Sequence, residues 1–145
     1  MRRTIARLGL MLAASSLVAC DDVTDIIPGE TYELVEANGQ ELPAVVFEGD
    51  MPPFGFVVAT VVDGSITLRE STYSQELTFD IETESGEFPG DPVTVRGDYT
   101  ADGNILTFDP DDATAPEFTG TLSGGTLTTV EDHPDFGTVT AVWQR

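Results

Sequence analysis

From Thr31 to the C-terminus, apolar and polar residues alternate, and turn-forming dipeptides interrupt the alternation at short intervals. Because successive side chains of a strand point to opposite faces, a period of two predicts antiparallel strands with one apolar face each. The expected strands span 30–36, 43–48, 54–62, 65–69, 73–82, 93–100, 105–109, 117–122, 126–130 and 138–144. Tight hairpins, which need positive φ angles, are expected at four pairs: Asn38-Gly39, Asp63-Gly64, Asp102-Gly103 and Gly124-Gly125.

The parity of each strand predicts which side chains face the interior. Tyr73, Leu77, Phe79 and Ile81 share one face of their strand, and polar residues occupy the other face. Short strands with one apolar face must either close into a barrel or pack against a second sheet, because an open sheet leaves unpaired edges. We therefore predict an all-β fold, a single antiparallel up-and-down β-barrel of about eight to ten strands, with a two-sheet β-sandwich as the alternative.

The N-terminus has the layout of an export signal. Arg2, Arg3 and Arg7 precede or flank an apolar run over residues 8–18, which is shorter than the roughly 20 residues of a membrane-spanning helix. The run ends in Leu17-Val18-Ala19-Cys20, which resembles the lipobox of bacterial lipoproteins. That resemblance implies a signal helix within residues 1–19 and acylation of Cys20. The charged and turn-forming residues that follow indicate a lipidated tether over 20–29, and the alternating pattern indicates a β domain over 30–145. An ordinary secretory signal followed by a chance cysteine is the alternative.

The charge of the chain restricts its partners. Removal of residues 1–19 leaves three arginines, Arg69, Arg96 and Arg145, against all 26 acidic residues, and the chain has no lysine. Phosphate groups and anionic headgroups repel such a body, so we expect no binding to nucleic acid and no peripheral adsorption to a membrane. Lipidated Cys20 is then the expected membrane attachment of a monomer in the bacterial cell envelope, on the extracytoplasmic side of the inner or outer membrane.

Few residues suit catalysis or metal binding. His133 is the only histidine, and Cys20 is the only cysteine. We therefore predict no enzymatic activity and no cofactor. Asp109, Asp111 and Asp112 form a weak calcium candidate, because calcium prefers oxygen ligands. Their spacing does not follow the EF-hand pattern, so a solvated loop is the favoured interpretation.

Several features together resemble the small bacterial lipocalin-like lipoproteins. They are the opening Gly29-Glu30-Thr31-Tyr32-Glu33-Leu34-Val35, the Asp-Gly pairs, Gly97-Asp98-Tyr99-Thr100 and a last strand that contains Trp143. Lipocalins open with Gly-x-Trp, whereas the first aromatic residue here is Tyr32, three positions after Gly29. The resemblance implies a barrel mouth that takes a small apolar molecule. The candidate lining residues are Tyr32, Phe79, Tyr99, Phe118 and Trp143.

The same aromatic residues have a second interpretation. A barrel of about eight strands is just wide enough for side chains to fill it, and we favour filling over a pocket. Two functions follow from the two interpretations. One is a non-catalytic binding module for a small apolar ligand, and the other is a structural, interaction or inhibitor-type envelope lipoprotein with a filled barrel and working loops at 82–92 and 110–116.

Overall fold

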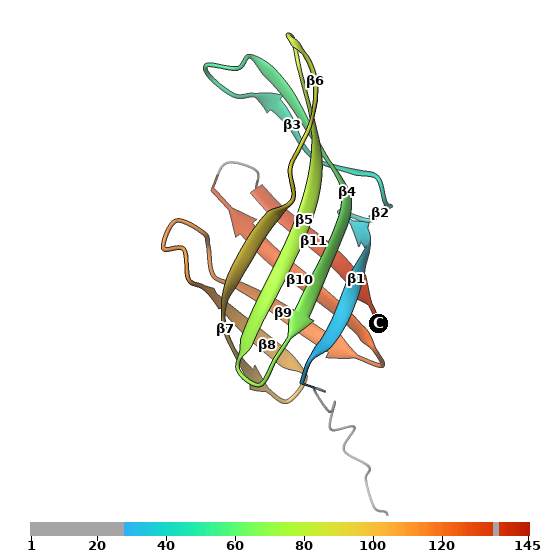
Figure 1. Ribbon diagram of the computed structural model, residues 1–145, viewed down its shortest axis with the longest axis vertical. Helices are drawn as coiled ribbons and strands as arrows, with labels where there is room; N and C mark the ends of the chain where they lie inside the picture. The colour runs from blue at the N-terminus through green and yellow to red at the C-terminus, as the bar shows by residue number, and fades with distance from the viewer. Residues whose placement is uncertain (1–27, 135–136) are drawn as a thin grey trace, which may run out of the picture.

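The computed structural model describes residues 28–134 and 137–145, which form an all-β structure. The strands are β1 (Glu30–Ala37), β2 (Gln40–Glu41), β3 (Ala44–Asp50), β4 (Phe56–Leu68), β5 (Thr72–Thr83), β6 (Gly86–Pro89), β7 (Val93–Asp102), β8 (Ile105–Pro110), β9 (Phe118–Ser123), β10 (Thr126–His133) and β11 (Gly137–Gln144). Eight of them form a closed antiparallel ring in the order β1-β11-β10-β9-β8-β7-β5-β4, and β4 pairs back with β1 (Figure 1). The predicted barrel is confirmed, and β2, β3 and β6 are additions to it.

Three of the four predicted turns are present. Gly103 joins β7 to β8 with a φ of 62°, and Gly124 and Gly125 join β9 to β10 with φ angles of 58° and 84°. Asn38 and Gly39, with φ angles of 50° and 76°, join β1 to β2. Glycine adopts this left-handed region without the steric cost that a Cβ atom brings, which explains why these positions reverse the chain.

The predicted hairpin at Asp63-Gly64 is wrong, because this pair lies inside β4. The pairing of β4 with β5 shifts by one residue between Val61 and Asp63, which marks a bulge that bends the strand. A Cβ atom on Gly64 would lie 2.7 Å from Cδ2 of Leu77, so glycine is needed for close packing rather than for a turn. The predicted strands 54–62 and 65–69 are therefore one strand of 13 residues.

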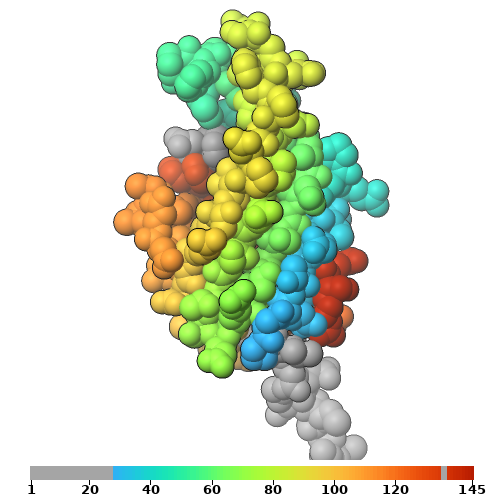
Figure 2. Space-filling model, in the orientation of Figure 1, coloured from blue at the N-terminus to red at the C-terminus, as the bar shows by residue number. Residues whose placement is uncertain are grey.

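A projecting sheet extends β4 and β5 beyond the barrel. Residues 56–61 of β4 pair with β3, and residues 80–83 of β5 pair with β6. We call these four paired segments the flap. Figures 1 and 2 show its two hairpins standing clear of the barrel body, on the side opposite the start of β1. The segment 82–92, predicted as a loop, therefore contains β6 and belongs to the flap.

Aromatic rings fill the barrel interior away from the flap. Phe108 and Phe118 stack with their centroids 4.5 Å apart, and Tyr73 meets them edge-on at 5.0 Å and 5.6 Å. Tyr99 lies 5.9 Å from Phe108. The inward row predicted for β5 is confirmed at Tyr73, which is buried. The rings form a packed cluster that closes this part of the interior to a ligand.

The chain enters the fold at the filled end of the barrel. The amide of Gly29 donates to the carbonyl of Leu68 at 2.6 Å, and Arg145 forms an ion pair of 2.9 Å with Glu30. The predicted signal 1–19, the acylation site Cys20 and the tether up to residue 27 lie outside the described residues. Within the part of the chain that the structure describes, no helix has the length and apolar character to cross a membrane.

Candidate functional site

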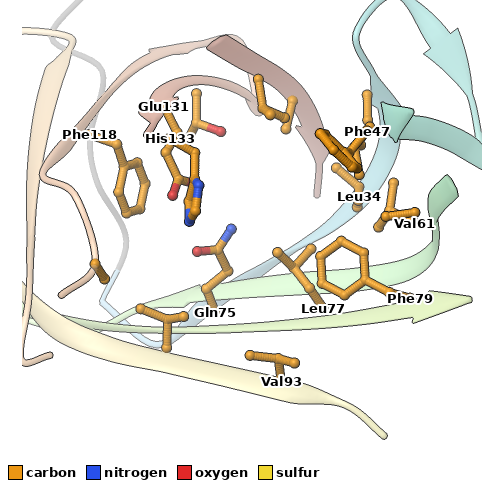
Figure 3. A pocket seen from close by; sticks show the side chains of 18 of the residues that line it. Leu34, Phe47, Val61, Gln75, Leu77, Phe79, Val93, Phe118, Glu131 and His133 are labelled. Carbon is orange, nitrogen blue, oxygen red and sulfur yellow. The ribbon is translucent and has the colours of Figure 1, made fainter. Parts of the chain in front are cut away.

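A cavity of about 360 Å³ occupies the barrel interior between the aromatic cluster and the flap. Most of its lining side chains are apolar and come from strands all around the barrel (Figure 3). They include Leu34, Val61, Leu77, Phe79, Ile81 and Trp143. The volume lies within the range of about 300–1,000 Å³ that is usual for small-molecule sites. The interior is therefore filled by side chains at one end only, contrary to the expectation of a fully filled barrel.

The cavity reaches solvent near the start of β7. Val93 lines the cavity and yet has 51% of its surface exposed. The apolar wall continues onto the flap, because exposed Phe88 of β6 pairs with Ile81 of β5, and directly paired residues share one face of a sheet. Val46 and Phe47 of β3 line the cavity as well. An apolar molecule longer than the cavity would find a continuing apolar surface along the flap.

The only tryptophan of the chain is held rigidly in the cavity wall. Trp143 is fully buried, and its Nε1 donates a hydrogen bond of 2.9 Å to Oγ1 of Thr129. This bond satisfies the indole N–H, which would otherwise be buried without a partner. Trp143 thus presents a fixed aromatic face to the cavity, and its fluorescence will report occupancy of the cavity.

One side of the cavity is polar. Gln75 of β5 and Glu131 and His133 of β10 line it together, and their side chains approach one another in Figure 3. Gln75 is only 5% exposed. Burial raises the pKa of Glu131, and the charge of nearby His133 partly opposes that rise. The site therefore combines a large apolar wall with a small group of polar side chains.

The five aromatic residues singled out from the sequence separate into two groups. Phe79, Phe118 and Trp143 line the cavity. Tyr32 and Tyr99 are buried in the core and are absent from the described lining. The hydroxyl of Tyr32 donates instead to Glu30 at 3.2 Å, at the filled end of the barrel.

The sequence interpretation missed the polar lining residues. Gln75 has the same strand parity as Tyr73 and Leu77, but the inward row predicted for this strand did not include it. Glu131 and His133 were missed because the predicted strand ended at residue 130, whereas β10 continues to His133. A polar residue at an inward position of an apolar row was the signal that would have identified Gln75.

One of the calcium candidates, Asp112, takes part in a turn. Among the described residues, no group of three or more His, Cys, Asp or Glu side chains converges in a way that would hold a metal ion. Asp112 instead accepts hydrogen bonds from the backbone amide and the hydroxyl of Thr114, at 2.9 Å and 2.7 Å. These two bonds lower the pKa of Asp112 and stabilise the turn between β8 and β9.

A scan against protein-family models gives no match to this chain, and a search of curated proteins gives none either.

Proposed function

We propose that this protein is a membrane-anchored, non-catalytic binding module of lipocalin-like type for a small apolar ligand. The observation that carries the proposal is the apolar cavity of about 360 Å³, which opens beside the flap. Burial of an apolar molecule there is favourable by about 25 cal/mol for each Å² removed from water. The barrel would shield the ligand from water and present it at one end.

The end at which the chain enters the barrel supports this function. The first described residues lie at the filled end of the barrel, since Gly29 bonds to Leu68, and the flap lies at the other end (Figure 1). An acyl anchor on Cys20 would thus leave the mouth free to exchange ligand, on the extracytoplasmic side of the bacterial membrane that holds it. The excess of acidic residues keeps the body itself away from anionic headgroups.

A binding titration tests the proposal. A chain of residues 21–145 starts after the predicted signal and acylation site and contains every strand of the barrel, so it can be purified without detergent. The neutral apolar probe decanol is added, and the fluorescence of Trp143 is followed together with the heat of binding. We expect saturable binding of one molecule per chain, because the cavity holds a single ligand of this size.

A matched pair of variants localises the binding. Ala59 lines the cavity, whereas its neighbour Val58 has the opposite parity and is absent from the described lining. Ala59→Leu fills part of the cavity and should weaken decanol binding at least tenfold, while Val58→Leu should leave it within about twofold. Equal effects of the two substitutions, or no saturable binding to the parent chain, would refute the proposed function.

Exposed aromatic residues on the flap and in its β3–β4 turn favour a second candidate, an interaction module of the cell envelope. Phe54 and Phe56 are 63% and 42% exposed, and Phe88 is 51% exposed. Exposed apolar groups that gather in one region often mark a contact surface. A chain that binds no decanol but loses an envelope partner on Phe54→Ser would support this candidate over the ligand-binding module.

A further inference from the structure

The amide of Gln75 is the starting point for identifying the ligand class. The residue is 5% exposed, and no hydrogen bond of its side chain is described. Among the described residues, only the Tyr73 hydroxyl is a fully buried side-chain group without a partner, so the Gln75 amide is open to the cavity. Figure 3 shows the amide pointing across the cavity toward Glu131 and His133. Polar groups buried in an apolar interior normally have partners, so an amide that faces a cavity is suited to bind a polar group of a ligand.

The carboxylates give the surroundings of this amide a mostly negative charge. Among the described residues that line the cavity, Glu131 is the only carboxylate, His133 beside it is the only basic side chain, and none is a lysine or an arginine. The same field acts deeper in the barrel, where burial and then the charges of Glu131, Asp111 and Asp109 raise the pKa of Tyr73. Arg145, which could oppose this field, is paired with Glu30 at the filled end. An anionic headgroup is therefore disfavoured in the cavity, and a cationic one is favoured.

We propose that the cavity binds an apolar molecule with a protonated amine as its headgroup, in which the Glu131 carboxylate accepts a charge-assisted hydrogen bond and the Gln75 carbonyl oxygen accepts a second one. This inference rests on the proposed function and names its ligand class. The apolar part of the ligand lies against Phe79, Phe118 and Trp143. An ammonium group has three donors, so one headgroup can satisfy both acceptors at once.

Three probes with the same chain length and different headgroups test the assignment. Decylamine, decanol and decanoic acid are titrated into the chain of residues 21–145 at about pH 8, where ordinary carboxyl groups are ionised. Trp143 fluorescence and calorimetry measure affinity and stoichiometry. We expect decylamine to bind about tenfold more tightly than decanol, and decanoic acid to bind most weakly.

A matched pair of substitutions distinguishes the effect of the Glu131 carboxylate from that of the overall negative charge of the protein. Glu131→Gln keeps the side-chain size and should weaken decylamine binding about tenfold more than it changes decanol binding, and cooperative thermal unfolding shows that the fold is intact. Glu76→Gln removes the same charge from the exposed position next to Gln75 and should leave both affinities unchanged. Decanol should also displace decylamine in competition, since both occupy one cavity.

The outcomes distinguish failure of the amine assignment from failure of the proposed binding function. Binding of all three probes with similar affinity, a preference for decanoic acid, or equal effects of Glu131→Gln and Glu76→Gln overturns the amine assignment and leaves the apolar binding function standing. Failure of decanol and decylamine alike overturns the proposed function and, with it, the ligand class.

Discussion

The hydroxyl of Tyr73 is buried without a hydrogen-bond partner among the described residues, so its removal should stabilise the protein. A buried hydroxyl that lacks a partner costs about 1–3 kcal/mol relative to one in water. Tyr73→Phe removes the hydroxyl and keeps the edge-on ring contacts with Phe108 and Phe118 at 5.0 Å and 5.6 Å. We expect the free energy of unfolding to rise by about 1 kcal/mol, which raises the melting temperature by roughly 4 °C in a domain of this size.

Tyr32→Phe is the matched control, because the hydroxyl of Tyr32 donates to Glu30 at 3.2 Å. Loss of that bond should lower the free energy of unfolding by about 1 kcal/mol. Urea unfolding followed by the fluorescence of buried Trp143 measures both variants with one probe. A decrease for Tyr73→Phe as large as that for Tyr32→Phe would show that the Tyr73 hydroxyl is satisfied, and would refute the reasoning.

The difference between Tyr73→Phe and the parent chain should also depend on pH. Burial, followed by nearby carboxylates, raises the pKa of Tyr73 above its ordinary value of 10.0. The unfolded chain then loses the phenolic proton at a lower pH than the folded chain does, so the parent loses stability as the pH rises above about 10. Phenylalanine has no such proton, and the advantage of the variant should grow over that range. An unchanged difference between pH 8 and pH 11 would contradict the assignment.

Two further substitutions test the cavity wall and the barrel backbone. Burial raises the pKa of Glu131 in the folded chain above its ordinary value of 4.5, which the unfolded chain keeps. The protein therefore loses stability as the pH rises from 4.5 through the pKa of the folded state, because the folded chain then has to hold a buried charge. Glu131→Gln should therefore be more stable than the exposed control Glu76→Gln at pH 7, and this difference should vanish at about pH 3 in urea titrations. A Cβ atom on Gly97 would overlap the backbone carbonyl oxygen of Asp109, so Gly97→Ala should cost at least about 2 kcal/mol by thermal unfolding. Gly49→Ala meets only the far end of a flexible side chain and should change the stability by less than about 0.5 kcal/mol; equal losses for the two variants would exclude the backbone clash.

The error at Asp63-Gly64 shows where local turn rules stop working. The same dipeptide forms a turn at Asp102-Gly103 and lies within β4, next to a bulge, at Asp63-Gly64. The difference lies in distant neighbours, because a Cβ atom on Gly64 would lie 2.7 Å from Cδ2 of Leu77 and 3.1 Å from the carbonyl oxygen of Glu76, so these neighbours would have to shift. A glycine that is needed for close packing looks the same in the sequence as one that is needed for a positive φ.

The position of the cavity could not be predicted from the sequence either. Phe79, Phe118 and Trp143 were among the candidate lining residues, and all three line the cavity. Tyr99 was a candidate as well, yet it packs beside Phe108 in the filled part of the barrel. Parity states only that a side chain points inward. The height of a residue along the barrel axis depends on strand register, which bulges and pairing shifts set.

The local pattern of residues was sufficient for most strands of the barrel, for three of the turns and for closure into a barrel. The alternation of side chains and the backbone freedom of glycine act within a few residues. Tertiary pairing decided the rest. It joined two expected strands into β4, extended β4 and β5 into the flap, and gathered Gln75, Glu131 and His133 from two strands on one side of a cavity. These features depend on register between residues that are far apart in the chain, and register is a property of the closed sheet as a whole.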